Sequence, residues 1–144
     1  MADETVIDGK GKILGRVAST VAKMLLNNKK VALVNAGEIL ISGHPESIVQ
    51  KYKQRIELKD KANPEHSPYW PRRPDMLVRR IIRGMLPYKK AKGKNAYKLL
   101  RVYAGLPESL KNAKFYELNT KSANQIFEKT MSINELSEKL GYKR

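Results

Sequence analysis

The sequence predicts an α/β fold, and three observations in the amino-terminal part of the chain support this class. Residues 5–9, TVIDG, have the pattern of a short strand that ends at a glycine. Residues 14–27 carry apolar side chains at helical spacing, with polar side chains on the other side. Residues 31–34 and 39–41 are uninterrupted apolar runs, which are typical of strands covered on both faces in a parallel sheet. A strand, a helix and a strand within about 30 residues form a βαβ unit, whose crossover should be right-handed.

A long helix and a long loop are expected next. Residues 45–58 should form a helix that buries Ile48, Tyr52 and Ile56. Residues 60–75 contain four prolines, so neither a helix nor a central strand can pass through them. Because loops of this length are uncommon in compact domains unless they have a binding role, this loop is a candidate binding segment.

The rest of the chain should hold three helices and a strand. Asp75 can cap the first of these helices, and the S-x-x-E spacing from Ser132 to Glu135 predicts a capping box at the start of the last. Leu136 and Leu140 should be the buried residues of that last helix, which should end at Gly141. The expected elements are helices at 75–86, 94–100 and 132–141 and a strand at 101–104.

The length and composition predict one globular domain with no internal repeat. The chain has 144 residues, of which 41% are hydrophobic, enough for a buried core. We expect an α/β half over 5–58, a basic loop-and-helix segment over 59–101, and a closing strand and helix over 102–144.

The positive charge is concentrated in the middle of the chain. Residues 51–101 hold 16 Lys and Arg and four acids, a net charge of +12 out of +15 for the whole chain. The segments before and after them carry only +1 and +2. A basic block between nearly neutral ends predicts a surface that binds a polyanion, and nucleic acid is the default partner.

The predicted helix at 75–86 separates its apolar side chains from three arginines, Arg79, Arg80 and Arg83. A guanidinium group binds phosphate through a planar fork and stacks on bases, so three on one side suit a ribose-phosphate backbone. The alternative is a solvated helix with scattered surface charge. Acidic partners at i±4 would favour that alternative, but the helix has only Asp75, at its start. RNA or DNA binding is therefore the favoured interpretation.

Further basic and aromatic candidates flank this helix. The run at 87–94 is expected to be a flexible basic extension that orders on contact with phosphates. Tyr69, Trp70 and Tyr88 lie among the charges and could stack on unpaired bases. For Tyr69 and Trp70 a structural role is equally supported, and Tyr97 is expected in the core. The further candidate phosphate ligands are Arg72, Arg73, Lys89, Lys90, Lys92 and Lys94.

The turn Gly9–Gly15 is the strongest indication of an enzyme. It follows a predicted strand and opens a helix, as a dinucleotide-binding fingerprint does. However, its spacing is G-x-G-x-x-x-G, and Asn35 stands where an acid would bind ribose. A nucleotide-binding α/β enzyme is therefore the weaker alternative. Lys10, Lys12 and Arg16 could instead hold a nucleic-acid phosphate at the helix N-terminus, and a purely structural turn is equally supported.

Other chemistries have little support. The chain has no cysteine, which excludes disulfides, thiolate zinc sites and cysteine nucleophiles and fits a reducing compartment. His44 and His66 are isolated, so we expect neither a metal site nor a catalytic triad. Residues 1–5 lack the pattern of a signal peptide, and no apolar run approaches the roughly 18–20 residues of a membrane span. We expect a cytosolic protein without a cofactor, a small-molecule substrate or a membrane partner.

Several blocks of sequence resemble, in the same order, the universal protein thirteen family of the large ribosomal subunit. The resemblance covers about 5–106 and, more weakly, 132–141. The stretch PRRPD at 71–75, which leads into Arg79 and Arg80, resembles the archaeal branch. Gly37 is one residue more than the family's common Asn-Ala-Glu pattern has. The blocks are LGRVAS at 14–19, VNA at 34–36, ISG at 41–43, RGMLP at 83–87, KG at 92–93 and LRVYAG at 100–105.

The resemblance implies a three-layer α/β/α domain around a mostly parallel sheet of about four strands. It also implies a protein without catalysis that binds large-subunit ribosomal RNA, neighbours other large-subunit proteins in the cytoplasmic ribosome, and acts early in subunit assembly. The residues that the resemblance implies as RNA contacts are Arg16, Arg83, Lys89, Lys90 and Lys92.

Overall fold

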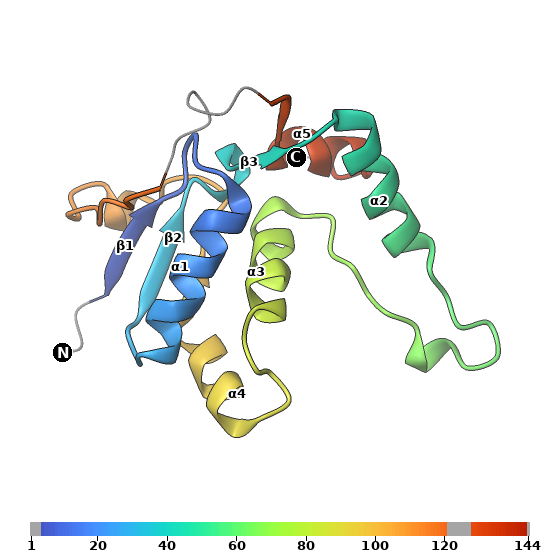
Figure 1. The fold of residues 1–144 in the computed structure, drawn as a ribbon, viewed down its shortest axis with the longest axis horizontal. Coiled ribbons are helices and arrows are strands. Elements are labelled where there is room, and N and C mark those ends of the chain that lie inside the picture. Colours follow the sequence, from blue (N-terminus) through green and yellow to red (C-terminus); the bar gives the residue numbers. More distant parts are fainter. Residues whose placement is uncertain (1–3, 121–127, 144) are drawn as a thin grey trace.

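The computed structural model describes residues 4–120 and 128–143, and it confirms the α/β class (Figure 1). The strands β1 (Thr5–Asp8), β2 (Val31–Val34) and β4 (Leu100–Val102) form a parallel sheet in the order β1-β2-β4. The helix α1 (Leu14–Leu26) connects β1 to β2, so the predicted βαβ unit is confirmed. Residues 1–3, on which part of the signal-peptide prediction rested, lie outside the described residues.

The apolar run at 39–41 does not join this sheet, which corrects one prediction. Its strand β3 (Leu40–Ser42) pairs antiparallel with β5 (Thr130–Ser132) in a separate two-stranded sheet. Between β2 and β3 the chain forms a 3-10 helix, η1 (Ala36–Glu38), whose start is hydrogen-bonded to residues 103–105. The backbone carbonyls just beyond β4 are therefore bonded to η1. The chain turns at η1, and β3 leaves the parallel sheet. The central sheet therefore has three strands where about four were implied.

The helices lie close to their predicted ranges, with two corrections. Asp75 does not cap its helix, because Arg73 is the N-cap residue and Asp75 lies in the first turn. The run at 87–94, expected to be flexible, is a turn followed by the start of a helix at Ala91. In the described part of the chain, no helix combines the length and apolar character needed to cross a membrane. The helices after α1 are α2 (Pro45–Glu57), α3 (Pro74–Gly84), α4 (Ala91–Lys98) and α5 (Ile133–Lys139).

Both faces of the parallel sheet are covered, which explains the apolar runs without alternation. One face contributes Ile7, Leu33 and Leu100 to the main core, together with buried side chains of all five helices. The other face contributes Val6, Ala32 and Val34 to a smaller cluster. The chain after β4, including the 3-10 helix η3 (Glu108–Leu110), packs on that second face, so the layer there is not an α-helix. The single-domain organisation stays a prediction.

The last helix, α5, has the predicted cap at its start. The Ser132 hydroxyl oxygen accepts a hydrogen bond of 3.2 Å from the backbone N–H of Glu135, and Leu136 and Leu140 are buried as predicted. Its end carries Gly141 at φ 98°, in the left-handed region that favours glycine. The serine cap and the glycine stop together fix both ends of this short helix.

Substituting Ser132 with alanine is expected to lower the free energy of unfolding by about 1 kcal/mol, because one N–H at the start of α5 loses its acceptor. Urea denaturation followed by circular dichroism measures this change. Ser132→Asp keeps an acceptor at the same position and should retain most of the stability. An equal loss in both variants would contradict the capping role.

Candidate nucleic-acid interface

The buried side of α3 fixes the direction of its arginines. Leu77, Val78 and Ile82 are fully buried, so the opposite side of the helix faces outward. Met85, predicted on the apolar side, is 42% exposed, and Leu86 takes its place in the core. The reason is that the helix ends at Gly84, so helical spacing no longer applies to Met85.

Arg79, Arg80 and Arg83 are half-buried, and each of their guanidinium groups lies over an aromatic ring. Such cation–π contacts contribute roughly 0.5–2 kcal/mol each, and they restrict the motion of the arginine side chains. Restricted side chains lose less entropy when they bind a phosphate, so this helix presents its charges in a prepared arrangement. From the guanidinium carbon to the ring centre the distance is 4.7 Å for Arg79 over Tyr97, 4.7 Å for Arg80 over Trp70 and 4.8 Å for Arg83 over Tyr88.

Trp70 anchors the proline-rich segment to the body of the protein. Besides Arg80, the guanidinium of Arg55 lies 4.7 Å from the centre of this ring, and Tyr52 meets it edge-on at 6.0 Å. Of the two roles left open for Trp70, these contacts support the structural one. Arg55 was missed by the sequence analysis. Its spacing of three from Tyr52 on a helix could have indicated the pairing with Tyr52, but not the contact with Trp70.

The tyrosines differ in how far they are engaged within the protein. Tyr88 is 39% exposed and meets Tyr97 edge-on at 5.5 Å, and Tyr97 is half-buried against the main core. Tyr69 is 81% exposed. Of the three candidates for base stacking, Tyr69 therefore offers the largest free ring surface.

Arg72, Arg73 and the basic residues after α3 extend its arginine side in both directions. Arg72 and Arg73 are exposed directly before the helix, and the Arg72 carbonyl accepts a hydrogen bond from the hydroxyl of Ser137 on α5. Lys89 and Lys90 are exposed on the turn between α3 and α4, and the remaining two lysines are exposed on α4. We call this set the basic band: Arg72, Arg73, Arg79, Arg80, Arg83, Lys89, Lys90, Lys92 and Lys94.

The charges of the basic band are largely unneutralised. Over residues 4–120 and 128–143, its only member within 4.0 Å of a carboxylate is Arg73, whose guanidinium lies 3.0 Å from Asp75. Burial lowers the pKa of Arg80, and the nearby positive charge of Arg83 lowers it further. Both effects disfavour the charged form, so an anion bound between these side chains would relieve the repulsion.

Lys10 and Lys12 lie in the β1–α1 turn, and Arg16 lies in the first turn of α1. None of the three belongs to the basic band. The ammonium of Lys10 lies 3.5 Å from the Glu38 carboxylate. The four backbone N–H groups at 9–12 donate to the Val34 carbonyl, the Asp8 carboxylate, and the carbonyls of Glu38 and Gly9, respectively. Residues 9–12 therefore use their backbone N–H groups within the protein and do not present them to a dinucleotide phosphate.

The fold and the surface together define a basic α/β protein with a band of largely unneutralised cations. No group of three His, Asp or Glu side chains placed to hold a metal occurs in the described residues. Residues 2–109 match the sequence profile of the family described as Ribosomal protein L13. The chain belongs to this family, whose members are structural and not enzymatic.

Curated archaeal relatives match nearly the whole chain, which confirms the archaeal type. The large ribosomal subunit protein uL13 of Methanosphaera stadtmanae is 44% identical over 96% of this chain and 98% of the relative. The protein of the same name from Methanocaldococcus jannaschii is also 44% identical, over 96% of this chain and 98% of its own. The one from Archaeoglobus fulgidus is 37% identical, over 98% and 90%.

Proposed function

We propose that this chain is a structural constituent of the large subunit of the cytoplasmic ribosome and binds large-subunit ribosomal RNA through the basic band. The observation that carries the proposal is the outer side of α3, where three guanidinium groups are fixed over aromatic rings. The relatives are named as large ribosomal subunit proteins, so we take large-subunit ribosomal RNA as the RNA that is bound. Neighbouring ribosomal proteins are further partners, and early subunit assembly is the stage at which the chain acts.

Binding would depend on charge and on the shape of the folded RNA. Arginine and lysine side chains that neutralise phosphates release condensed counterions, which favours association. Folded RNA presents its phosphates in a defined geometry, and fixed guanidinium groups can match that geometry with few base-specific contacts. The Lys10, Lys12 and Arg16 side chains would add a second contact area at the start of α1.

Affinity for large-subunit ribosomal RNA is expected to fall by roughly a thousandfold or more between 50 and 200 mM salt, if six to ten phosphates are neutralised. Filter binding across this salt range measures the effect. The basic band has nine basic residues, enough to neutralise six to ten phosphates if most of them make a contact.

A neutral polymer of similar size, such as dextran, provides the negative control because it has no phosphates to bind. An affinity for the RNA that stays flat across the salt range would overturn the proposed mode of binding.

A further inference from the structure

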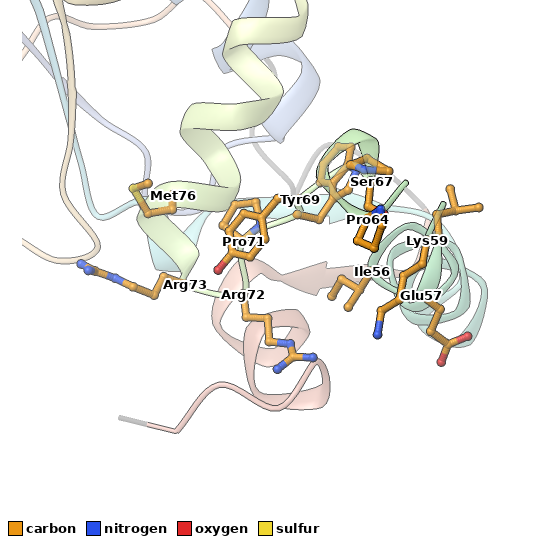
Figure 2. A pocket seen from close by; sticks show the side chains of 13 residues that line it. Ile56, Glu57, Lys59, Pro64, Ser67, Tyr69, Pro71, Arg72, Arg73 and Met76 are labelled. Atoms are coloured by element: carbon orange, nitrogen blue, oxygen red, sulfur yellow. The ribbon is translucent and has the colours of Figure 1, made fainter. Parts of the chain in front are cut away.

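A groove of about 1030 Å³ lies between the end of α2 and the proline-rich segment that leads into α3. Figure 2 shows Ile56, Glu57 and Lys59 on one side of it and Pro71 and Met76 on the other. The lining is mostly apolar, with prolines, aromatic rings and aliphatic side chains. In Figure 1 the same segment, coloured green, runs out from the body of the protein and returns to α3. One wall of the groove is therefore a segment that extends from the body of the protein.

Trp70 and Tyr69 are neighbours in the lining of this groove, and they differ in how firmly they are held. Trp70 is held by the Arg55 and Arg80 guanidinium groups, which ties the segment to α2 and α3. Tyr69 precedes it and is 81% exposed. Pro68 and Pro71 on either side restrict the backbone, so the ring is held out at little entropic cost. An exposed ring on a stiff, anchored segment is a prepared stacking surface.

The charge at the groove favours a nucleotide as the occupant. Arg72, Arg73 and Lys59 line the groove, with one carboxylate, Glu57, among the lining side chains. Because Arg73 is already paired with Asp75 at 3.0 Å, Arg72 and Lys59 are the cations placed to bind a phosphate. An unpaired nucleotide has an apolar base face for the ring and a phosphate for these cations. A base inside an A-form duplex cannot reach the groove, because its faces are stacked on its neighbours.

We propose that this groove is a binding site for an unpaired nucleotide of single-stranded RNA, whose base stacks on Tyr69 and whose phosphate contacts Arg72. The inference rests on the proposed function, because it assigns one contact within RNA binding. It assigns separate contacts to two parts of the surface. The basic band neutralises the phosphate backbone of folded RNA, and the groove binds a base that is turned out of the RNA helix.

Tyr69→Ala in the full chain is expected to weaken binding of a fluorescein-labelled 12-nucleotide oligoadenylate about tenfold, since stacking on one base contributes roughly 1–3 kcal/mol. Affinity for a fluorescein-labelled 12-base-pair RNA duplex should not change. Tyr69→Phe keeps the ring and should bind the oligoadenylate as the parent chain does. Fluorescence anisotropy measures all of these affinities at one salt concentration.

Tyr116→Ala is the matched control, because Tyr116 is also exposed, at 49%. It directly follows Phe115, which pairs with Val6 of β1, and β1 lies far from the groove (Figure 1). This substitution should change neither affinity. Unchanged oligoadenylate binding by Tyr69→Ala, or an equal loss on the duplex, would overturn the nucleotide site. Ultraviolet crosslinking of the oligoadenylate should label Tyr69, and labelling confined to other segments would also overturn the nucleotide site. None of these outcomes would affect the proposed function. That function fails only if the parent chain does not bind RNA.

Discussion

Replacing Arg79, Arg80 and Arg83 with glutamine is expected to weaken binding to large-subunit ribosomal RNA by roughly a hundredfold at 0.15 M salt. Each phosphate contact releases nearly one counterion equivalent, which at this concentration contributes about 1 kcal/mol. The slope of log affinity against log salt concentration should also decrease by about three. Filter binding over a salt series measures both quantities.

Glutamine is preferred to glutamate because each arginine lies over a ring whose face is electron-rich. A carboxylate at these positions would be repelled by the ring and would disturb the packing of α3. The matched control removes the same number of charges outside the basic band, with Lys114, Lys129 and Lys143, all exposed, changed to glutamine. If both triple variants lose equal affinity, binding depends on net charge alone and α3 has no special role.

Substituting Gly93 with alanine is expected to destabilise the protein by about 3 kcal/mol and to lower its melting temperature by roughly 10 °C. A Cβ atom at this position would overlap the carbonyl group of Pro87 and lie 2.8 Å from the backbone nitrogen of Tyr88. The obstacle is backbone rather than a flexible side chain, so α4 must move away from the turn before it. Differential scanning calorimetry measures the change.

The same displacement should weaken RNA binding, because Lys89 and Lys90 lie on that turn and Tyr88 supports Arg83. Gly15→Ala is the matched control. Gly15 lies in the first turn of α1 with open space around it, so alanine should stabilise the protein by about 0.5–1 kcal/mol. A melting temperature of Gly93→Ala equal to that of the parent would show that the turn adapts to the added methyl group.

Much of the fold could be predicted because local rules determine it. Three features depend on neighbours in sequence: the helical spacing of residues 14–27, the serine cap at Ser132 and the apolar run of β2. The errors arose where distant contacts decide. The run at 39–41 has the pattern of a buried strand, yet β3 pairs with a strand about 90 residues further along the chain. That partner, Thr-Met-Ser, is too short for its alternation to predict a strand.

The candidate interface shows the same division. Charge segregation indicated the arginines of α3, and their spacing indicated that they share one side. The contacts of those arginines could not be predicted, because Trp70, Tyr88 and Tyr97 come from three different segments. Arg55 was missed for the same reason.

The sequence by itself determined the α/β class, the concentration of charge in residues 51–101 and the family, since composition, periodicity and motif order are properties of the chain alone. Only the tertiary structure decided which aromatic rings hold the arginines. It also decided that Trp70 is half-buried beneath two guanidinium groups while Tyr69 is 81% exposed. The physical reason is that stacking and burial depend on where separate segments meet in space. Packing of the whole chain, and not the local pattern, sets that meeting point.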